Sequence, residues 1–282
     1  MSICTSMAAR SLLVPAVLLV LCGFAALGQQ QRPHGHPPPT STPSPSPSST
    51  IWRPSGKIAW QWQLTTPVDL SVSASVYDID MFDNDATVVS ALHAAGRKAI
   101  CYIDFGTWEN WRPDASFFPA SVKGAQNGWP GELWLDIRQL SVLEPIMSAR
   151  LDLCKAKGFD AVEPDNIDGY SNPTGFPLTC QDQIAYDTWI ASAAHARGLS
   201  VGLKNDLDQV SDLISQFDWA LDEQCYQYQE CDALTPFVQA DKAVFEVEYS
   251  EDVANFCPVT DALRLNSMKK HLSLNAWREP CP

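Results

Sequence analysis

The stretch FDAVEPDNIDGY, residues 159–170, joins a short apolar run to a group of acids. The run has the length of a buried strand, and the glycine just before it is typical of the end of a helix. Glu163, Asp165 and Asp168 stand where the run ends. Three acids at this point indicate a solvated turn, a metal site or a catalytic pair of carboxylates. The fold around the stretch decides among these interpretations.

Similar apolar runs recur from residue 57 onwards, and helix-like segments lie between several of them. The expected strands are residues 57–64, 75–82, 98–105, 159–165, 199–205, 217–223, 243–249 and 271–277. The expected helices are residues 86–96, 142–158, 182–198 and 207–216, and three of them end at or just before a glycine.

Alternating strands and helices predict a parallel sheet with right-handed crossovers. Eight strands in a segment of this length favour an α/β fold of the (β/α)8 TIM-barrel type, in a single domain over residues 55–282. The long segment 106–141 carries four tryptophans after the third expected strand. We expect it to cover the mouth of the barrel, with an ordinary packed loop as the alternative.

The N-terminal part of the chain has two segments of different character. Residues 1–28 contain an arginine followed by a long apolar stretch that ends in small residues, which is typical of a signal peptide. The apolar stretch is almost long enough to span a bilayer, so an uncleaved type II membrane anchor is the alternative. Residues 29–54 are rich in proline, serine and threonine and predict a disordered linker. We expect a secreted protein, with membrane or cell-wall association as the alternative, and a monomer.

The chain is acidic, with a formal net charge of -14. This charge disfavours nucleic acid as a partner, because phosphates require a basic surface. It is compatible with a cationic ligand.

Seven of the nine cysteines lie beyond residue 28, where an oxidising compartment would favour disulfides. We expect Cys225 to pair with Cys231, and Cys257 to pair with Cys281. Among the remaining three cysteines, Cys101 lies in an expected strand and is predicted to be a buried free thiol.

Polar residues end nearly every expected strand, and in a barrel of this kind the strand ends line the catalytic mouth. These residues are Asp80, Asp104, Asp165, Lys204, Asn205, Glu223, Glu248 and Tyr249. Their position at the same end of successive strands predicts a polar cleft.

The motif content narrows the chemistry of this cleft. The expected domain has three histidines, all placed away from the mouth by the expected elements, which argues against zinc. A hard cation held by carboxylates is the alternative. Motifs for a serine nucleophile elbow, a P-loop or a dinucleotide are absent from the sequence. The expected cleft therefore contains mainly carboxylates and aromatic residues. This combination is typical of a glycosidase that needs no metal or cofactor.

The two-residue period of a strand selects among the acids. Glu163 and Asp165 share one face of their strand, with Asp165 nearer the rim. Asp222 and Glu223 point to opposite faces, and Glu223 points inward if Trp219 fills the barrel.

The segments KIAWQWQL, CYIDFGTWENWRPD, FDAVEPDNIDGY, GLKND, ALDEQC and VFEVEY resemble glycoside hydrolase family 114, the endo-α-1,4-polygalactosaminidases. The resemblance covers residues 55–280 and implies a (β/α)8 barrel that cleaves a secreted polymer of α-1,4-linked galactosamine. It places the two catalytic acids on Asp165 and Glu223, the pair that the strand period favours.

Deacetylated galactosamine carries an ammonium group, and a ring of Asp80, Asp104, Glu163 and Asp168 is expected to hold it by charge-assisted hydrogen bonds. The expected substrate-binding residues are Asp80, Asp104, Trp108, Glu163, Asp168, Lys204, Asn205, Glu248 and Tyr249. Glu163 has a structural role beneath the nucleophile as its alternative, and Lys204 is expected to pair with Asp165 or Glu163. We expect Asp165 to be the nucleophile and Glu223 the general acid and base of a retaining reaction. The alternatives are a catalytically silent carbohydrate-binding barrel and an endoglycosidase for another polysaccharide.

Overall fold

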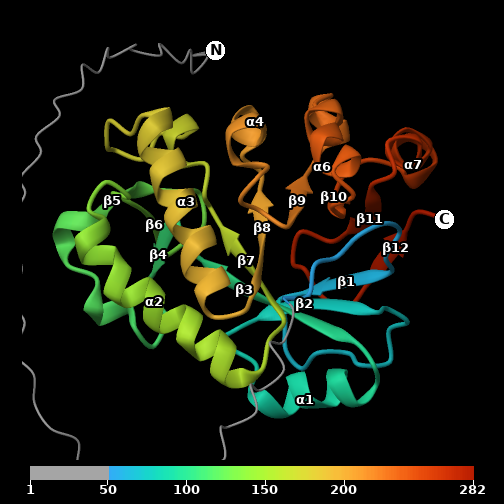
Figure 1. The fold of residues 1–282 in the computed structure, drawn as a ribbon, viewed down its shortest axis with the longest axis horizontal. Coiled ribbons are helices and arrows are strands. Elements are labelled where there is room, and N and C mark those ends of the chain that lie inside the picture. The colour runs from blue at the N-terminus through green and yellow to red at the C-terminus, as the bar shows by residue number, and fades with distance from the viewer. Residues whose placement is uncertain (1–50) are drawn as a thin grey trace, which may run out of the picture. The chain divides into compact units, whose positions relative to one another are not determined.

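The computed structural model describes residues 51–282, and it confirms the predicted α/β barrel (Figure 1). Eight parallel strands form one sheet in the order β1 (Trp60–Gln63), β2 (Val76–Asp80), β3 (Lys98–Asp104), β7 (Ala161–Asp165), β8 (Ser200–Lys204), β9 (Trp219–Glu223), β10 (Val244–Glu248) and β11 (Asn266–Lys270). The short strand β12 (Arg278–Pro280) pairs antiparallel with β11. Side chains join the two ends of the sheet, because Trp60 Nε1 donates to the Asn266 carbonyl at 2.8 Å. The sheet is therefore a nearly closed barrel.

Helices follow most of the strands and pack on the outside of the sheet. They are α1 (Ala86–Ala94), α2 (Leu140–Lys157), α3 (Cys180–Ala196), α4 (Val210–Leu213), α5 (Cys225–Tyr228), α6 (Thr235–Gln239) and α7 (Val253–Ala262). Helices α2 and α3 lie side by side on one flank (Figure 1). Short 3₁₀ segments occur at Ala115–Phe117, Ala120–Val122, Gly169–Ser171, Leu207–Gln209 and Cys231–Leu234. Residues 64–75 connect β1 to β2 without a helix. Within residues 51–282, every helix is too short or too polar to cross a bilayer.

Seven of the eight predicted strands are confirmed, and the eighth is wrong. Residues 271–277 form a loop, and β11 lies before them. The apolar alternation of 271–277 belongs to this loop, in which the His271 ring stacks on Trp277 with centroids 4.1 Å apart. Strand β11 has the sequence NSMKK and lacks an apolar run. Its polar side chains close the barrel instead, because Asn266 Oδ1 accepts from Ile58 N just before β1 and Lys270 donates to Gln61 Oε1 of β1. The predicted helix at 207–216 is reduced to a 3₁₀ segment and the single turn of α4.

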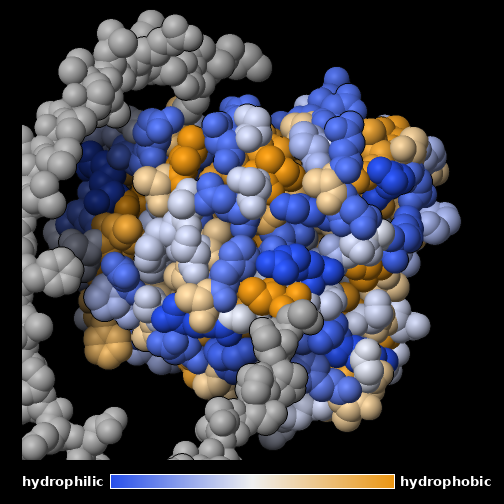
Figure 2. All heavy atoms as spheres, in the orientation of Figure 1, coloured by the Kyte–Doolittle hydropathy of each residue, from blue (hydrophilic) through white to orange (hydrophobic). Residues whose placement is uncertain are grey.

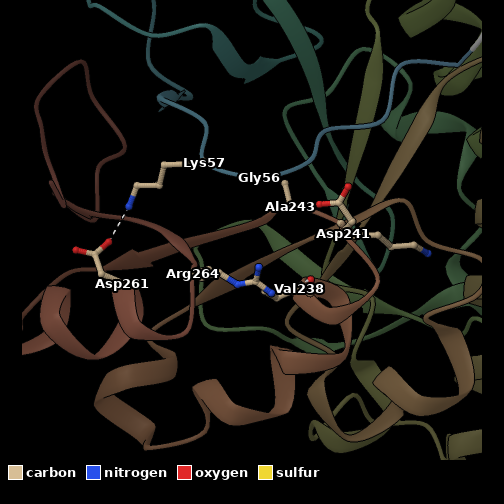
Figure 3. Close-up of a pocket in the computed structure, with 8 residues that line it drawn as sticks. Gly56, Lys57, Val238, Asp241, Ala243, Asp261 and Arg264 are labelled. Carbon is tan, nitrogen blue, oxygen red and sulfur yellow. Dashed lines mark hydrogen bonds and ion pairs between the residues drawn. The ribbon is translucent and has the colours of Figure 1, made fainter.

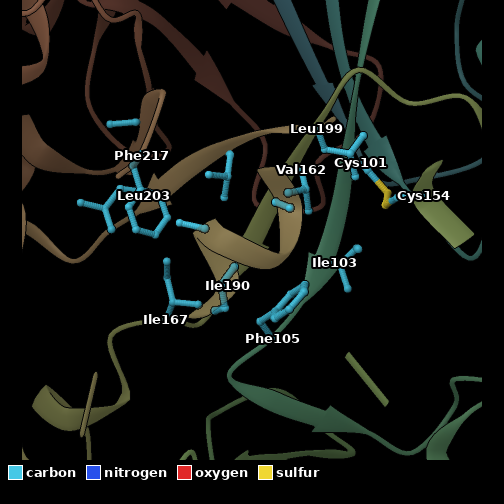
Figure 4. Packing of buried hydrophobic residues seen from close by; sticks show 14 of the residues in the cluster. Cys101, Ile103, Phe105, Cys154, Val162, Ile167, Ile190, Leu199, Leu203 and Phe217 are labelled. Atoms are coloured by element: carbon cyan, nitrogen blue, oxygen red, sulfur yellow. A yellow bond between two sulfur atoms is a disulfide. The ribbon is translucent and has the colours of Figure 1, made fainter. Parts of the chain in front are cut away.

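Two separate apolar clusters stabilise the barrel. Inside the barrel, Trp60, Trp62, Trp219 and Phe245 are fully buried. Gly202 makes room for them, because a Cβ at this position would lie 2.4 Å from the Trp219 ring. The larger cluster lies between the sheet and the helices, where Figure 4 shows the outward side chains of β3, β7 and β8 in contact with those of α3. Alternate residues of each strand therefore contribute to different cores.

The segment between β3 and α2 forms a small antiparallel sheet of its own. Its strands are β4 (Thr107–Glu109), β5 (Lys123–Gln126) and β6 (Glu132–Leu135), in the order β4-β6-β5. Trp134 is buried, whereas Trp111 and Trp129 are 52% and 54% exposed. Part of this insertion therefore exposes aromatic side chains, as expected for a cover of the barrel mouth. Another part is an ordinary packed segment.

The structure contains disulfides Cys225–Cys231 and Cys257–Cys281. It also joins Cys101 of β3 to Cys154 of α2, so the predicted free thiol at Cys101 is wrong. Cys101 points outward from the barrel into the helical layer, which brings it to α2 (Figure 4).

The segments predicted as a signal peptide or anchor and as a linker lie outside the described residues, except for residues 51–54. Trp52, Arg53 and Pro54 contact the barrel. Arg53 pairs with Asp218 at 2.6 Å, and the Pro54 carbonyl accepts from Ala243 N at 3.0 Å. On the face shown in Figure 2, hydrophilic residues surround small groups of hydrophobic ones.

Candidate active site

A cleft of about 350 Å³ opens at the carboxyl ends of the strands. Residues from all eight barrel strands or the loops that follow them, together with the insertion, line this cleft. They are Trp62, Leu64, Asp80, Asp83, Tyr102, Glu109, Trp111, Arg112, Trp129, Glu132, Asp165, Asn166, Asn205, Glu223, Tyr249, Leu272, Ser273 and Leu274. The strand ends therefore form a polar cleft with aromatic walls, as the sequence predicts.

Lys204 lies beneath the floor of the cleft and joins three carboxylates. Its Nζ is 2.7 Å from Asp165 Oδ1, 3.0 Å from Glu223 Oε2 and 3.1 Å from Glu163 Oε1. Burial alone would lower the pKa of Lys204, but the three carboxylates raise it well above its ordinary value. Lys204 is therefore a permanent cation that binds both predicted catalytic acids.

Asp165 ends β7 and is held as a carboxylate. Tyr102 donates its hydroxyl to Oδ2 at 2.7 Å, and the Asn166 backbone N–H donates to Oδ1 at 2.9 Å. Burial would raise the pKa of Asp165, but Lys204 and these two donors together lower it below its ordinary value. The geometry therefore provides an ionised carboxylate inside the cleft.

Glu223 ends β9 and points inward because Trp219 and Leu221 fill the barrel on the same face. Its Oε1 accepts a short hydrogen bond from the Tyr249 hydroxyl. Asn205 donates to Oε2 at 3.3 Å and accepts from the Glu223 backbone N–H at 2.9 Å. The side chain of Glu223 is thus oriented by two neighbouring strands.

Asp165 and Glu223 lie close together across Lys204. Because Lys204 Nζ is 2.7 Å from one carboxyl oxygen and 3.0 Å from the other, these two oxygens are at most 5.7 Å apart. Carboxyl pairs in retaining glycosidases are about 5–5.5 Å apart, and those in inverting enzymes are about 6.5–9.5 Å apart. The upper limit of 5.7 Å between these two oxygens lies below the separation of an inverting pair.

Glu163 lies one layer below Asp165 on the same face of β7 and is completely buried. Burial raises its pKa to about 7, while Lys204 opposes this effect. Glu163 does not line the cleft, so its position fits the structural alternative rather than substrate binding.

The predicted ring of four acids for an ammonium group does not form. Arg112 binds Asp80 through two nitrogens, at 2.6 and 3.1 Å. Asp104 accepts from the Thr107 backbone and hydroxyl and from Asn166 Nδ2. Burial and the Asp165 charge raise the pKa of Asp104 to about 6. Both acids already have partners from the insertion or from the loop after β7.

Three further predicted binding residues lie outside the cleft. Trp108 donates its ring N–H to the Ala115 carbonyl at 2.9 Å and packs within the insertion. Glu248 accepts from the backbone N–H groups of Tyr226 and Gln227 at the start of α5. Asp168 lines a neighbouring hollow after β7 and β8. Of the predicted binding residues, Asp80, Asn205 and Tyr249 line the cleft itself.

Sequence reasoning missed several residues that line the cleft. Tyr102 stands two positions before Asp104, so the strand period alone places it on the same inward face. Glu109, Arg112 and Glu132 belong to the insertion, whose folding has no periodic signal in the sequence. Only the path of that insertion brings them to the cleft.

Sharp turns follow three successive strands at the site. Asn166, Asn205 and Gln224 come directly after Asp165, Lys204 and Glu223, and all three have positive φ angles of 59°, 56° and 68°. Left-handed backbone is uncommon in residues other than glycine, although asparagine tolerates it comparatively well. These turns end each strand at its functional side chain.

One group of acids has the spacing of a cation site. Asp104, Glu109 and Glu132 each offer an oxygen, and the three oxygens lie within 4.8 Å of one another. The sequence leaves a hard cation held by carboxylates as an alternative, but it does not assign any of these three acids as a metal ligand.

A second pocket lies at the opposite end of the barrel (Figure 3). Lys57, just before β1, pairs with Asp261 at 2.7 Å, and Arg264 and Lys242 add two more cations. The pocket has three basic and two acidic residues, so it differs in charge from the acidic cleft at the carboxyl ends.

A (β/α)8 barrel with two close carboxylates and aromatic walls at the carboxyl ends of its strands defines the class of the glycoside hydrolases. Residues 41–282 match the model of glycoside hydrolase family GH114, so the chain belongs to this family. It is a glycoside hydrolase similar to the endo-α-1,4-polygalactosaminidases.

Solved structures agree with this assignment. The chain is similar to Aspergillus fumigatus Ega3, seen in a crystal structure with galactosamine, at 40% identity and a TM-score of 0.79. The match covers 83% of this chain and 99% of Ega3. The glycoside hydrolase domain of PelA from Pseudomonas aeruginosa is 11% identical with a TM-score of 0.62, over 80% of this chain and 98% of that domain, and shares the fold. A search of curated proteins finds no match.

Proposed function

We propose that this protein is a secreted, endo-acting hydrolase of α-1,4-linked galactosamine-containing polysaccharides that uses Asp165 and Glu223 in a retaining reaction. The observation that carries this proposal is the pair of carboxylates, with oxygens at most 5.7 Å apart, at the base of an open cleft. The similarity to Ega3, a protein crystallised with galactosamine, supports the class of substrate. The three disulfides of residues 51–282 support an oxidising compartment.

The two acids have different roles in the proposed reaction. Asp165 is the nucleophile, because Lys204, Tyr102 and the Asn166 N–H favour its ionised form. One of its oxygens attacks C1 of the sugar while the bond from C1 to the glycosidic oxygen breaks. Glu223 gives its proton to the glycosidic oxygen, which leaves with the shortened polymer.

The second half of the reaction reverses these roles. Glu223, now a carboxylate, removes a proton from a water molecule that attacks C1. The ester bond between C1 and Asp165 breaks, which restores both side chains and retains the configuration at C1. Tyr249 and Asn205 keep the Glu223 carboxyl pointed into the cleft through both steps.

The direct test measures new reducing ends after incubation of galactosaminogalactan with the purified protein. Asp165→Asn and Glu223→Gln should each lower turnover by about 10³-fold or more, because each change removes a group that reacts. Glu144→Gln, an exposed position on α2, is the matched control and should keep wild-type activity. Near-wild-type activity in either active-site variant would show that the assigned acid does not react. Binding without cleavage by the wild-type protein would indicate a carbohydrate-binding barrel instead.

The stereochemical claim has its own test. Nuclear magnetic resonance of the freshly formed reducing ends should show the α-anomer first, because two displacements restore the starting configuration. An initial excess of the β-anomer would show a single displacement and would refute the nucleophilic role of Asp165.

A further inference from the structure

The loop of residues 271–277 follows β11 and forms one wall of the cleft. Its residues Leu272, Ser273 and Leu274 line the cleft together with Asp165. In the order of the eight barrel strands, β11 lies four positions from β7, so this loop stands across the mouth of the barrel from Asp165. A sugar unit held against Asp165 therefore lies between that carboxylate and this loop.

Three successive carbonyl groups of the loop are held by the barrel. The Leu274 carbonyl accepts at 3.0 Å from the backbone N–H that directly follows β1. The Asn275 carbonyl accepts from Lys270 Nζ at 2.7 Å, and the Ala276 carbonyl accepts from Gln61 Nε2 at 2.8 Å. Backbone groups that are paired in this way hold the loop in one path.

The backbone of the loop is strained at a residue that lines the cleft. Leu274 has a φ angle of 45°, in the left-handed region that a leucine rarely adopts. Such a conformation persists only where the surrounding structure fixes it, and it is concentrated at functional sites. The side chain of Leu274 packs on the apolar cluster inside the barrel, whereas Leu272 is 59% exposed. The loop therefore presents an apolar tip to the cleft.

Lys270 joins the loop to β1 from a buried position. Besides the Asn275 carbonyl, its Nζ donates to Gln61 Oε1 at 3.3 Å. Burial, followed by the charge of Arg278, lowers the pKa of Lys270 to about 7, and no described carboxylate offsets this effect. Burying a charged amine without an acidic partner costs free energy. The contacts of Lys270 therefore indicate a role in holding the loop.

We propose that residues 271–277 form the wall that holds the reacting sugar unit against Asp165, and that Lys270 is a positioning residue that acts through this wall. This inference depends on the proposed function, because it assigns a part of the same cleft. The side chains of Leu272 and Leu274 offer only carbon atoms, so they suit the C–H face of the sugar ring rather than its amine or hydroxyl groups. The wall therefore contacts acetylated and deacetylated units equally.

The first test shortens the exposed tip of the wall. Leu272→Ala should raise KM for the polymer about 10-fold, because the sugar loses most of the apolar surface that the leucine side chain covers. The thermal unfolding midpoint should stay the same, since Leu272 is 59% exposed. Leu153→Ala makes the same change at an exposed position on α2 outside the cleft and should leave KM unchanged.

Binding is measured separately from hydrolysis. Isothermal titration calorimetry compares galactosamine oligomers with N-acetylgalactosamine oligomers of the same length, in an Asp165→Asn background that prevents cleavage. Adding Leu272→Ala should weaken binding of both oligomers by the same factor of about 10, because the wall contacts the ring and not its nitrogen.

The second test separates a positioning role of Lys270 from a purely structural one. Lys270→Met should lower kcat/KM about 10-fold, because the loop loses one of the hydrogen bonds that hold it. Together with Leu272→Ala it should lower kcat/KM by less than the product of the two single effects, since both changes act on the same wall. Lys242→Met is the matched control, because the Lys242 amine donates to the carbonyls of Ile214 and Phe217 at the amino end of the barrel. It should leave kcat/KM unchanged.

The opposite results are equally specific. Wild-type affinity in the Leu272→Ala variant, or a loss of affinity confined to one of the two oligomers, would overturn the wall. Independent effects of Lys270→Met and Leu272→Ala, or a lowered unfolding midpoint of Lys270→Met with wild-type kcat/KM, would overturn the positioning role. If Lys270→Met does not fold, Gln61→Met removes the neighbouring bond to Ala276 and makes the same comparison.

Hydrolysis by the wild-type protein distinguishes this inference from the proposed function. Weaker oligomer binding in the Leu272→Ala variant, without any cleavage by the wild type, would refute the hydrolase and leave the wall standing. Cleavage with the same KM in the wild type and in Leu272→Ala would refute the wall alone. Failure of the wild-type protein to bind either oligomer would refute both.

Discussion

Replacing Lys204 with methionine is the most informative perturbation of the site, because Lys204 Nζ contacts three carboxylates within 3.1 Å. Lys204 and Glu163 are almost completely buried, so the change leaves negative charges without a partner. Removal of one member of a buried ion pair costs about 3–5 kcal/mol. We therefore expect the free energy of unfolding of Lys204→Met at neutral pH to fall by about that amount.

The same substitution should change the pH dependence of catalysis. Lys204 is the main group that lowers the pKa of Asp165, and an opposite charge at this distance lowers a carboxyl pKa by about 1–3 units. Asp165 acts as a nucleophile only when ionised, so activity is lost as the pH falls through its pKa. In Lys204→Met this acidic limb should therefore move to higher pH.

The assay is kcat/KM for reducing-end release between pH 3 and 8, with urea unfolding at each pH on the same samples. Lys155→Met, an exposed position on α2, is the control and should keep both the wild-type profile and the wild-type stability. A Lys204→Met protein that is active with an unshifted acidic limb would refute the role of Lys204 in holding Asp165 ionised.

Three further predictions concern the aromatic wall, the disulfide and a buried acid. Trp111→Ala should raise KM for polymer about 10-fold by removing a stacking face, with unchanged thermal stability, whereas Phe117→Ala, also exposed on the insertion but outside the cleft, should leave KM unchanged. A Cys101→Ala, Cys154→Ala double variant should lose about 4 kcal/mol in denaturant unfolding, because the bond closes a loop of 53 residues; an unchanged midpoint would contradict this. Burial raises the pKa of Asp206 to about 8, so its contribution to stability is fully present below its unfolded pKa near 4 and is lost as the pH rises to 8. The free energy of unfolding of Asp206→Asn should therefore fall less than that of the wild type between pH 5 and 8, by up to about 1.4 kcal/mol per pH unit, and parallel curves for the two proteins would contradict the shift.

Local patterns in the sequence account for the fold and for the two central acids. Apolar runs and glycine-ended helices identified seven of the eight barrel strands, because both signals depend on residues close in the chain. The two-residue period of a strand correctly placed Asp165 and Glu223 on the inward face. The eighth strand was missed because the side chains of Asn266 and Lys270 in β11 close the barrel, and these polar residues leave no apolar pattern.

The partners of each acid depended on the tertiary structure. The sequence by itself determined that acids end the strands, but not that Arg112 binds Asp80 or that Glu248 caps α5. The sequence predicted that Lys204 pairs with Asp165 or Glu163, whereas in the structure Lys204 contacts three carboxylates. These contacts join residues 19 to 41 positions apart, so no local pattern in the sequence records them. A strand's period decides which way a side chain points, whereas the packing of the whole barrel decides what it meets there.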